Sequence, residues 1–179
     1  PASYRRNEGC HLAMSIYFVA GGARSGKSRK AEELAISFST HDKPIYIATA
    51  LASDQEMVDR IAKHRSDRGD RFTLIEEPKD LSGVLARVAS DVTVLVDCLT
   101  LWLSNIFEDE SDSNQRVIAA AKARSGLTIF VSNEVGEGIV PMHPVSRKFR
   151  DLSGIMNQRF AQESDSVFYM KFGIAQQLK

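Results

Sequence analysis

The amino-acid sequence predicts a three-layer α/β fold in which helices cover both faces of a mostly parallel central sheet. Short apolar runs rich in β-branched residues alternate with longer stretches whose apolar residues recur at helical spacing. The short runs are almost continuously apolar, which is typical of strands buried on both faces of a parallel sheet. No stretch rich in proline, glycine or serine divides the chain, so we expect one domain.

The first half of the chain predicts two strand–helix units. The apolar run 16–20 (IYFVA) ends in glycines, and a helical pattern of apolar residues follows at 27–38. The run 44–48 (PIYIA) predicts a second strand, and the charged stretch 54–68 predicts a second helix. The residues of this second helix that we expect to face the core are Met57, Ile61 and Val58.

The second half continues the same alternation. Strands are predicted at 72–75, 92–96, 127–132 and 167–170. Helices are predicted at 81–88, 99–107 and 145–163. The acidic stretch 108–113 (EDESDS) is expected to form a loop between the second and third of these strands.

Composition and charge exclude several classes of protein. The chain has 179 residues, of which 43% are hydrophobic and 26% charged, as expected of a globular domain rather than a disordered one. Lys and Arg number 23, as do Asp and Glu, so the basic excess of a general nucleic-acid or anionic-membrane binder is absent. Two cysteines are too few for a disulfide framework, which fits a reducing, cytoplasmic location.

The segments outside the periodic pattern carry no membrane signal. No apolar run approaches the roughly 20 residues that a transmembrane helix needs. Residues 1–13 are polar and lack the apolar centre of a signal peptide, so we interpret them as an upstream extension or an expression scar. Met14 is then a plausible native start, and the single domain is expected to span 14–179.

A phosphate-binding loop joins the first strand to the first helix. Residues 21–28 (GGARSGKS) match the pattern G-x-x-x-x-G-K-[ST], with a predicted strand before it and a helix after it. The backbone N–H groups of such a loop, together with the helix N-terminus, attract phosphate oxygens. Lys27 would reach the β- and γ-phosphates and Ser28 would bind Mg²⁺; the alternative is a glycine-rich turn without a ligand. The sequence therefore predicts a P-loop NTPase-type fold.

A carboxylate follows the strand predicted at 92–96. Asp97 ends the sequence Val-Leu-Val-Asp, and P-loop proteins commonly place an acidic residue at the end of such a buried strand to hold Mg²⁺. The alternative is that Asp97 only caps the helix that follows. The residues alone thus indicate a Mg²⁺-dependent nucleotide binder, without identifying the group that receives phosphate.

A histidine lies among arginines in the charged helix. At helical spacing, His64 is one turn from both Arg60 and Arg68. Neighbouring arginines disfavour the protonated imidazole, a neutral imidazole is a competent nucleophile, and arginines bind phosphate well. This pattern suits attack on the α-phosphate of a nucleotide. By spacing alone, a solvated charged helix face is the more common explanation.

Two further clusters follow the strand predicted at 127–132. The segment 133–141 (NEVGEGIVP) lies at the carboxyl end of that strand, where open α/β sheets bind ligands, although a plain connection would look the same. Arg147, Lys148 and Arg150 then occur near the start of the long helix, with Asn157 further along it. These basic residues would contact phosphate or pair with nearby carboxylates, which is the commoner use.

Taken together, these motifs make the chain resemble the bifunctional adenosylcobinamide kinase / adenosylcobinamide-phosphate guanylyltransferase family of cobalamin biosynthesis. The resemblance covers essentially all of 14–179 and is carried by several separate segments. They are GGARSGKS at 21–28, YIATA at 46–50, 54–68, EEP at 76–78, VDCLTLWLSN at 96–105, SNEVGEGIVP at 132–141 and FRDLSGIMNQ at 149–158. The stretch 106–126 is short relative to the family, and Phe72 stands where the family often has tryptophan.

The resemblance implies two reactions in one site. The first phosphorylates the aminopropanol hydroxyl of adenosylcobinamide with ATP or GTP. The second transfers GMP from GTP to that phosphate through a histidine, here His64, and releases adenosylcobinamide-GDP and pyrophosphate. It also implies a homotrimer. The expectations of a cytoplasmic location, of no nucleic-acid partner and of no membrane span come from the composition instead.

The resemblance further implies which residues act. His64 and Lys27 would be catalytic, and Ser28 and Asp97 would hold Mg²⁺. The nucleotide contacts would be Gly21, Gly22, Ala23, Arg24, Ser25, Gly26, Lys27, Ser28, Ala48, Thr49, Ala50, Arg65, Ser66, Asp67, Arg68, Glu76 and Asp97. Two alternatives remain open from the residues: a P-loop kinase of another small hydroxyl compound, and a nucleotide-dependent NTPase switch.

Overall fold

Within the described residues, the sheet has seven strands, six of them parallel. The computed structural model describes residues 15–52, 54–107 and 112–179; for residues 60, 64 and 67 it describes the backbone but not the side chains. The strands are β1 (Ile16–Gly21), β2 (Ile45–Ala48), β3 (Thr73–Glu76), β4 (Val94–Asp97), β5 (Thr128–Asn133), β6 (Ser166–Lys171) and β7 (Ile174–Gln177). Their order is β3-β2-β4-β5-β1-β6-β7, and only β7 runs antiparallel to its neighbour. The predicted mostly parallel sheet is confirmed.

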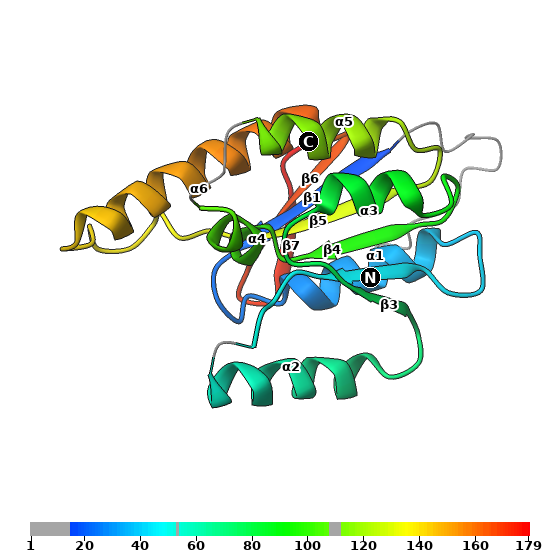
Figure 1. Ribbon diagram of the computed structural model, residues 1–179, viewed down its shortest axis with the longest axis horizontal. Coiled ribbons are helices and arrows are strands. Elements are labelled where there is room, and N and C mark those ends of the chain that lie inside the picture. The colour runs from blue at the N-terminus through cyan, green and yellow to red at the C-terminus, as the bar shows by residue number, and fades with distance from the viewer. Residues whose placement is uncertain (1–14, 53, 108–111) are drawn as a thin grey trace.

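Helices cover both faces of this sheet, as Figure 1 shows. They are α1 (Lys27–Phe38), α2 (Gln55–Arg68), α3 (Leu81–Arg87), α4 (Leu99–Asn105), α5 (Ser113–Lys122) and α6 (Pro144–Glu163). Buried residues of α1 pack with Val19 in one apolar core, whereas α3, α4, α5 and α6 pack around Phe18 in another. Successive residues of β1 therefore face opposite cores, because side chains alternate across a strand.

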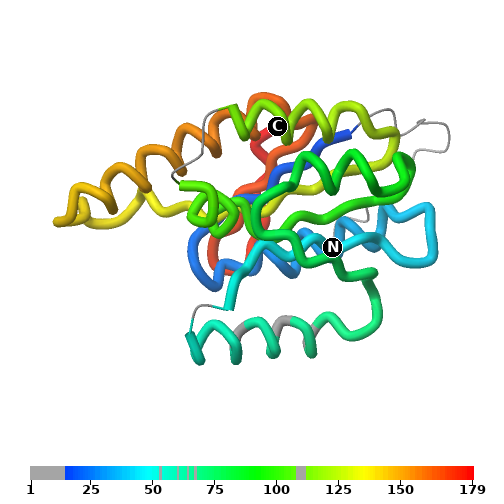
Figure 2. The backbone as a smooth tube through the Cα atoms, viewed as in Figure 1, coloured from blue at the N-terminus to red at the C-terminus, as the bar shows by residue number. Residues whose placement is uncertain are grey.

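Two segments stand away from these layers. Helix α2 lies apart from the sheet, and the first half of α6 projects beyond it together with the loop that precedes it (Figures 1 and 2). Most described side chains of α2 are exposed, whereas Met57 and Ile61 are half-buried. The expectation that Val58 faces the core is wrong, since this residue is 43% exposed. Because α2 stands apart from the sheet, only a narrow stripe of its surface is buried, and Val58 lies outside that stripe.

Two elements of the structure carry no clear sequence pattern and were not predicted. Helix α5 occupies a stretch without an expected helix, and its first residue, Ser113, belongs to the stretch expected as an acidic loop. The buried face of α5 is formed mainly by Val117, Ile118 and Ala121, and the small alanines around them blur the apolar periodicity. Strand β7 was missed because all of its residues are exposed. The expectations for residues 1–13 and for 108–111 lie outside the described residues.

A buried arginine joins α5 to α3 on one face of the sheet. The Arg124 guanidinium follows α5 and donates to the carbonyl oxygens of Leu85, Val88, Ala89 and Val92 at 2.6–3.4 Å. These carbonyls belong to the end of α3 and the turn after it, where a helix leaves acceptors unsatisfied. Burial lowers the pKa of the Arg124 guanidinium, but an arginine remains charged in proteins. No helix among the described residues is long and apolar enough to cross a membrane.

We expect Arg124→Met to lower the free energy of unfolding by about 3 kcal/mol, because it leaves buried carbonyl oxygens without donors. Thermal or urea unfolding followed by circular dichroism measures this change. Arg116→Met is the matched control, since Arg116 is an exposed arginine of α5, the helix that Arg124 follows. Equal stability of the two variants would show that the Arg124 hydrogen bonds do not hold α3 and α5 together.

Candidate active site

The strand register brings the predicted site residues to one edge of the sheet. Ala48 pairs with both Glu76 and Asp97, so the ends of β2, β3 and β4 are level. Gly21 pairs with Asn133, which places the end of β5 beside the start of the phosphate loop. Residues that the sequence separates by more than a hundred positions therefore line a single edge, formed by the carboxyl ends of the parallel strands. Ligands bind at this edge in open α/β sheets.

The phosphate loop is tightly folded against β6. A Cβ atom on Gly21 would lie 2.5 Å from the Met170 carbonyl oxygen, so only glycine fits there. Lys27 is buried, and its Nζ donates to the Gly22 carbonyl oxygen at 3.1 Å, which holds the ammonium over the loop. Within the described part of the chain, the buried Ser25 hydroxyl has no hydrogen-bond partner. The loop therefore presents a lysine cation to a bound phosphate. Its small glycine residues also let the backbone come close to that phosphate.

Asp97 faces the phosphate loop rather than the helix after it. Its Oδ2 accepts from the Ser28 hydroxyl at 3.5 Å and from the Tyr46 hydroxyl at 2.5 Å. The N-cap of α4 is Cys98, whose side chain makes no capping hydrogen bond. The alternative that Asp97 serves as a helix cap is thereby excluded.

The residues present fit Mg²⁺. Mg²⁺ prefers oxygen ligands, and in nucleotide sites it takes one or two carboxylates together with phosphate oxygens and water. The Ser28 hydroxyl and the Asp97 carboxylate supply such oxygens beside the phosphate loop. No group of three or more His, Cys, Asp or Glu side chains that could hold a metal ion occurs among the described residues.

Tyr46 is a site residue that the sequence analysis did not single out. It lies in the middle of the buried strand β2, where an apolar residue would be expected. Burial, with the negative charge of Asp97 next in size, raises the pKa of the Tyr46 hydroxyl, which therefore stays protonated and donates to Asp97. The one signal in the sequence was a tyrosine within a strand that is buried on both faces.

Arg68 connects helix α2 to this pair. Its guanidinium carbon lies 3.8 Å from the centre of the Tyr46 ring, and the side chain is buried. Stacking of a guanidinium on a tyrosine face is favourable, and more so when both groups are removed from water. A continuous set of contacts thus runs from Ser28 through Asp97 and Tyr46 to the end of α2.

Helix α2 begins and ends at well-formed caps. The Asp54 carboxylate accepts from the Met57 backbone N–H at 2.8 Å, and the chain leaves the helix at Gly69 with a positive φ. A pocket of about 220 Å³ lies between this end of α2 and strands β2 and β3. It is lined by Tyr46, Arg65, Arg68, Gly69, Asp70, Phe72 and Leu74. Of the predicted nucleotide contacts on α2, the structure brings Arg65 and Arg68 to one pocket.

The other residues predicted to contact nucleotide differ in their surroundings. His64 lies within α2, one turn before Arg68, but its side chain and that of Asp67 lie outside the described part. Ser66 and Glu76 are exposed, and Ala50 is half-buried. The Thr49 hydroxyl is buried and bonds both the N–H and the carbonyl oxygen of Cys98 at 2.8 Å. The Thr49 side chain therefore fixes the backbone beside Asp97 instead of facing outward.

A polar network holds the end of β5 against α4 and α6. The Ser132 hydroxyl donates to the Asn157 side-chain oxygen at 2.7 Å, and Asn157 donates to the Asn133 carbonyl oxygen at 3.2 Å. The Thr100 hydroxyl accepts from the Asn133 N–H at 2.8 Å. The Glu134 N–H donates to the Gly21 carbonyl oxygen at 3.0 Å. The segment expected to bind ligand after β5 therefore begins directly beside the phosphate loop.

The arginines at the start of α6 have structural partners. Arg147 Nη1 donates to the carbonyl oxygens of Pro141 and Met142 at 3.0 and 2.8 Å, and Arg150 lies 3.6 Å from the Asp151 carboxylate. Lys148 lies over the Phe107 ring. These contacts favour a structural role for the basic cluster over a phosphate site.

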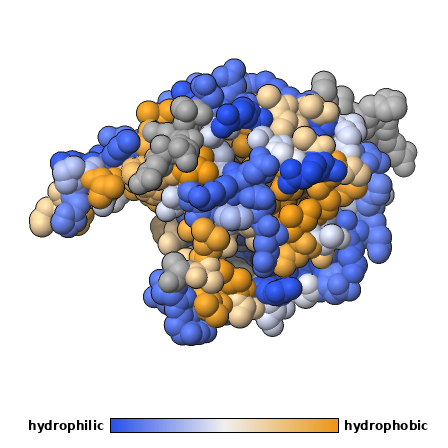
Figure 3. All heavy atoms as spheres, in the orientation of Figure 1, coloured by the Kyte–Doolittle hydropathy of each residue, from blue (hydrophilic) through white to orange (hydrophobic). Residues whose placement is uncertain are grey.

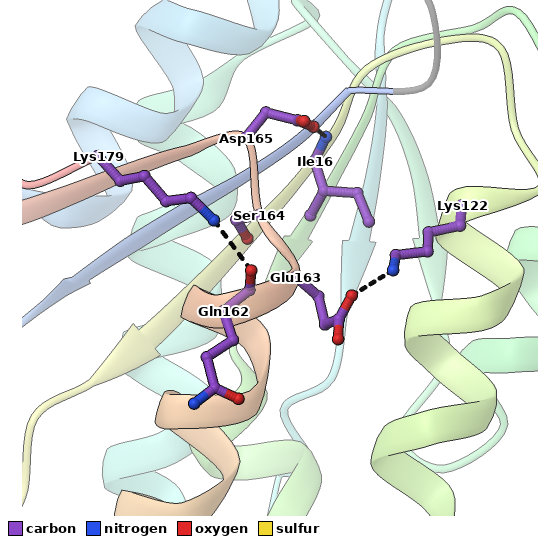
Figure 4. Close-up of a pocket in the computed structure, with 7 residues that line it drawn as sticks. All are labelled: Ile16, Lys122, Gln162, Glu163, Ser164, Asp165 and Lys179. Carbon is purple, nitrogen blue, oxygen red and sulfur yellow. Dashed lines mark hydrogen bonds and ion pairs between the residues drawn. The ribbon is translucent and has the colours of Figure 1, made fainter.

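A second pocket, of about 310 Å³, lies at the amino ends of the strands, away from these residues. Figure 4 shows its lining, in which charged groups face one another: Lys122 pairs with Glu163, and Lys179 Nζ donates to the Gln162 carbonyl oxygen at 2.9 Å. Asp165 accepts from the Ile16 N–H at 2.8 Å. These groups already satisfy one another, so the pocket adds nothing to the site at the opposite edge.

Comparison with known proteins identifies the family of this site. A family model described as cobinamide kinase / cobinamide phosphate guanyltransferase matches residues 17–178. The chain belongs to this family. It is 40% identical over 169 residues to the bifunctional adenosylcobalamin biosynthesis protein CobP of Pseudomonas aeruginosa, which covers 90% of this chain and 95% of the relative. The CobU proteins of Salmonella typhimurium and Escherichia coli are each 34% identical over 183 residues, covering 92% of this chain and 99% of each relative.

Solved structures agree with the P-loop NTPase-type fold. The flagellar accessory protein FlaH from Methanocaldococcus jannaschii superposes with a TM-score of 0.56 at 14% identity, covering 93% of this chain and 79% of that one. A solved ATPase domain superposes with a TM-score of 0.50 at 11% identity, covering 87% of this chain and 69% of that one. At such identities the likeness concerns the fold alone.

We expect Tyr46→Phe to raise the Mg²⁺ concentration needed for half-maximal nucleotide turnover by about tenfold, the lower end of the range for outer-shell partners of metal ligands. The phenylalanine ring keeps the contact with Arg68 while the donor to Asp97 is lost. Titration of Mg²⁺ at saturating ATP measures the change. An unchanged Mg²⁺ dependence would contradict the positioning role of Tyr46, and Tyr46→Leu, which also removes the ring, separates this role from the stacking of Arg68.

Proposed function

We propose that this chain phosphorylates adenosylcobinamide with ATP or GTP and then transfers GMP from GTP to the resulting phosphate. Membership of the family supports the pair of reactions. The observation that carries the assignment to this site is the contact chain from Ser28 through Asp97 and Tyr46 to Arg68. It joins the phosphate loop to α2, the helix that contains His64.

In the kinase step, the residues of the phosphate loop position the triphosphate. The aminopropanol hydroxyl oxygen attacks the γ-phosphorus, the bond from that phosphorus to its bridging oxygen breaks, and the hydroxyl proton passes to water. Lys27 neutralises the charge that builds on the phosphate oxygens, and Ser28 and Asp97 would hold Mg²⁺ there. Mg²⁺, when bound, supplies further charge neutralisation at those oxygens.

In the transferase step, we assign the nucleophile to His64. A ring nitrogen forms a bond to the α-phosphorus of GTP, and pyrophosphate leaves as the bond to the bridging oxygen breaks. A phosphate oxygen of adenosylcobinamide-phosphate then attacks the same phosphorus, the P–N bond breaks, and adenosylcobinamide-GDP leaves. Arg65 and Arg68 border a common pocket at the end of α2, where they would neutralise charge on the phosphate oxygens.

The exposure of α2 supports its role as a carrier of this nucleophile. Its described side chains are mostly exposed, and Arg68 is the buried one among them. A helix held mainly at one end can adjust the distance between His64 and the phosphate loop. The buried Arg68–Tyr46 contact would set the pivot of that adjustment.

With GTP labelled at the α-phosphate, we expect a protein-bound label that resists base and is released by acid, as a phosphorus–nitrogen bond requires. The label should be absent in His64→Ala. His41→Ala is the matched control, because His41 pairs with Asp91 away from this edge of the sheet.

Neither alternative would give this adduct, and a nucleotide-hydrolysis assay with and without the corrinoid separates the two. A P-loop kinase of another hydroxyl compound would bind GTP without forming the adduct. An NTPase switch would hydrolyse nucleotide at a rate that does not respond to the corrinoid. An undiminished adduct in His64→Ala would contradict the assignment of the nucleophile.

We also propose that the chain forms a homotrimer through its projecting arm, residues 134–150. This arm carries Ile139, Val140, Met142 and Val145, which are 97%, 61%, 82% and 61% exposed. Figure 3 shows apolar residues on this projection, with hydrophilic residues beside them. Exposed apolar groups on a segment that stands away from its own domain are typical of an interface.

Light scattering should therefore give the mass of three chains of 19.8 kDa. The double variant Ile139→Asp/Met142→Asp is expected to reduce that mass to one chain, because it places charges in the contact. Ile36→Asp, at an exposed apolar residue of α1, is the control. A wild-type mass of a single chain would contradict the trimer, and an unaltered trimer in the double variant would exclude the arm.

A further inference from the structure

An exposed aromatic side chain lies at the tip of the hairpin beside the phosphate loop. Strands β6 and β7 are joined by the two residues Phe172 and Gly173, since Lys171 pairs with Ile174. Phe172 is 88% exposed. Its ring centre lies 5.8 Å from Nζ of Lys171, which is itself an exposed residue. A phenylalanine with so much of its ring in water contributes little to the core of its own domain.

Turn chemistry does not account for this phenylalanine either. Phe172 has a φ of 55° and Gly173 a φ of 79°, the pattern of a tight two-residue hairpin turn in which both central residues are left-handed. Asparagine or aspartate followed by glycine is preferred there, whereas a bulky residue at positive φ is an outlier. Neither packing among the described residues nor backbone preference explains the residue at position 172, which points to a contact with a ligand or partner.

The turn is attached directly to the phosphate loop. The Gly173 N–H donates to the Ser25 carbonyl oxygen at 3.1 Å. A Cβ atom built on Gly26 would lie 3.5 Å from the Gly173 Cα, and one built on Gly173 would lie 3.8 Å from Arg29 Nη2. The turn therefore borders the start of α1, where the loop ends.

The sheet order gives the direction in which a nucleoside would leave the loop. Ser28 faces Asp97, which lies at the end of β4 on the β5 side of β1. The β- and γ-phosphates with their Mg²⁺ belong on that side. In a nucleotide bound at this loop as the donor of the kinase step, the α-phosphate end then faces the opposite side of β1, where β6 and β7 lie.

We propose that Phe172 is a stacking platform for the base of the nucleotide held at the phosphate loop. This inference rests on the proposed nucleotide site. Every base has a π-face, so stacking tolerates different bases, and a platform of this kind accepts ATP and GTP alike. Specificity for guanine in the second reaction would then have to come from other groups.

Equilibrium binding of β,γ-imido-ATP and of inorganic tripolyphosphate tests the platform, with Mg²⁺ present in both cases. Phe172→Asn suits the turn geometry and is expected to leave the stability unchanged or raised, while it removes the ring. We expect this variant to weaken β,γ-imido-ATP binding by about tenfold, within the range known for base–aromatic stacking. Tripolyphosphate, which has no base, should bind within about twofold of wild type on the same argument.

Matched variants separate loss of the ring from a general change in the hairpin. Ile174→Asn changes an exposed apolar residue of the same hairpin and should bind both probes as wild type does. Phe172→Trp keeps an aromatic face and should retain binding of β,γ-imido-ATP, with a change in fluorescence on binding.

Each contrary outcome has a distinct meaning. Unchanged β,γ-imido-ATP binding in Phe172→Asn would overturn the platform while the phosphate site stands. Equal weakening of both probes would overturn it in favour of a turn that shapes the loop, and a change of oligomeric mass would overturn it in favour of a subunit contact. Unchanged binding of both probes in Lys27→Ala would instead remove the proposed phosphate site on which the platform depends.

Discussion

The arrangement of this protein's site depends on one carboxylate. Asp97 Oδ2 accepts hydrogen bonds from a hydroxyl of the phosphate loop and from Tyr46, a residue of the neighbouring strand. Tyr46 in turn carries the guanidinium of Arg68 on its ring. Because β2 and β4 are paired with their ends level, the contacts can form without distortion of the sheet. The register of the parallel strands is thus what converts separate motifs into one site.

The two edges of the sheet and the two protruding segments, α2 and the arm, differ in their role. Groups at the amino ends of the strands satisfy one another, as the Lys122–Glu163 pair illustrates. At the carboxyl ends, Thr49 and Asn133 hold the residues after Asp97 in place. Thr49 accepts from the Cys98 N–H, and Asn133 donates to Thr100 and Cys98. Helix α2 and the arm extend from this second edge. The two proposed reactions, if both use this edge, would need such segments, because the proposed nucleophile and the acceptor must both approach the same nucleotide.

Periodicity and motifs predicted most of this arrangement. The six parallel strands and five of the six described helices follow from apolar runs and helical spacing, because burial on both faces leaves a strong pattern. Helix α5 and strand β7 did not, since the first is built on alanines and the second is exposed. The phosphate loop and Asp97 were predictable because their chemistry requires fixed residue types. Tyr46 was not, because its role comes from the strand pairing and not from its neighbours in the sequence.

The Mg²⁺ dependence of nucleotide binding in Asp97→Asn tests the central role of this carboxylate most directly. Asparagine keeps an oxygen that accepts from the Tyr46 hydroxyl, so this hydrogen bond persists while the negative charge is lost. Calorimetric titration with β,γ-imido-ATP, with and without Mg²⁺, separates the two effects. We expect binding without Mg²⁺ to stay near the wild-type value, and the gain from Mg²⁺ to fall by about tenfold or more. An undiminished gain from Mg²⁺ in Asp97→Asn would contradict the account.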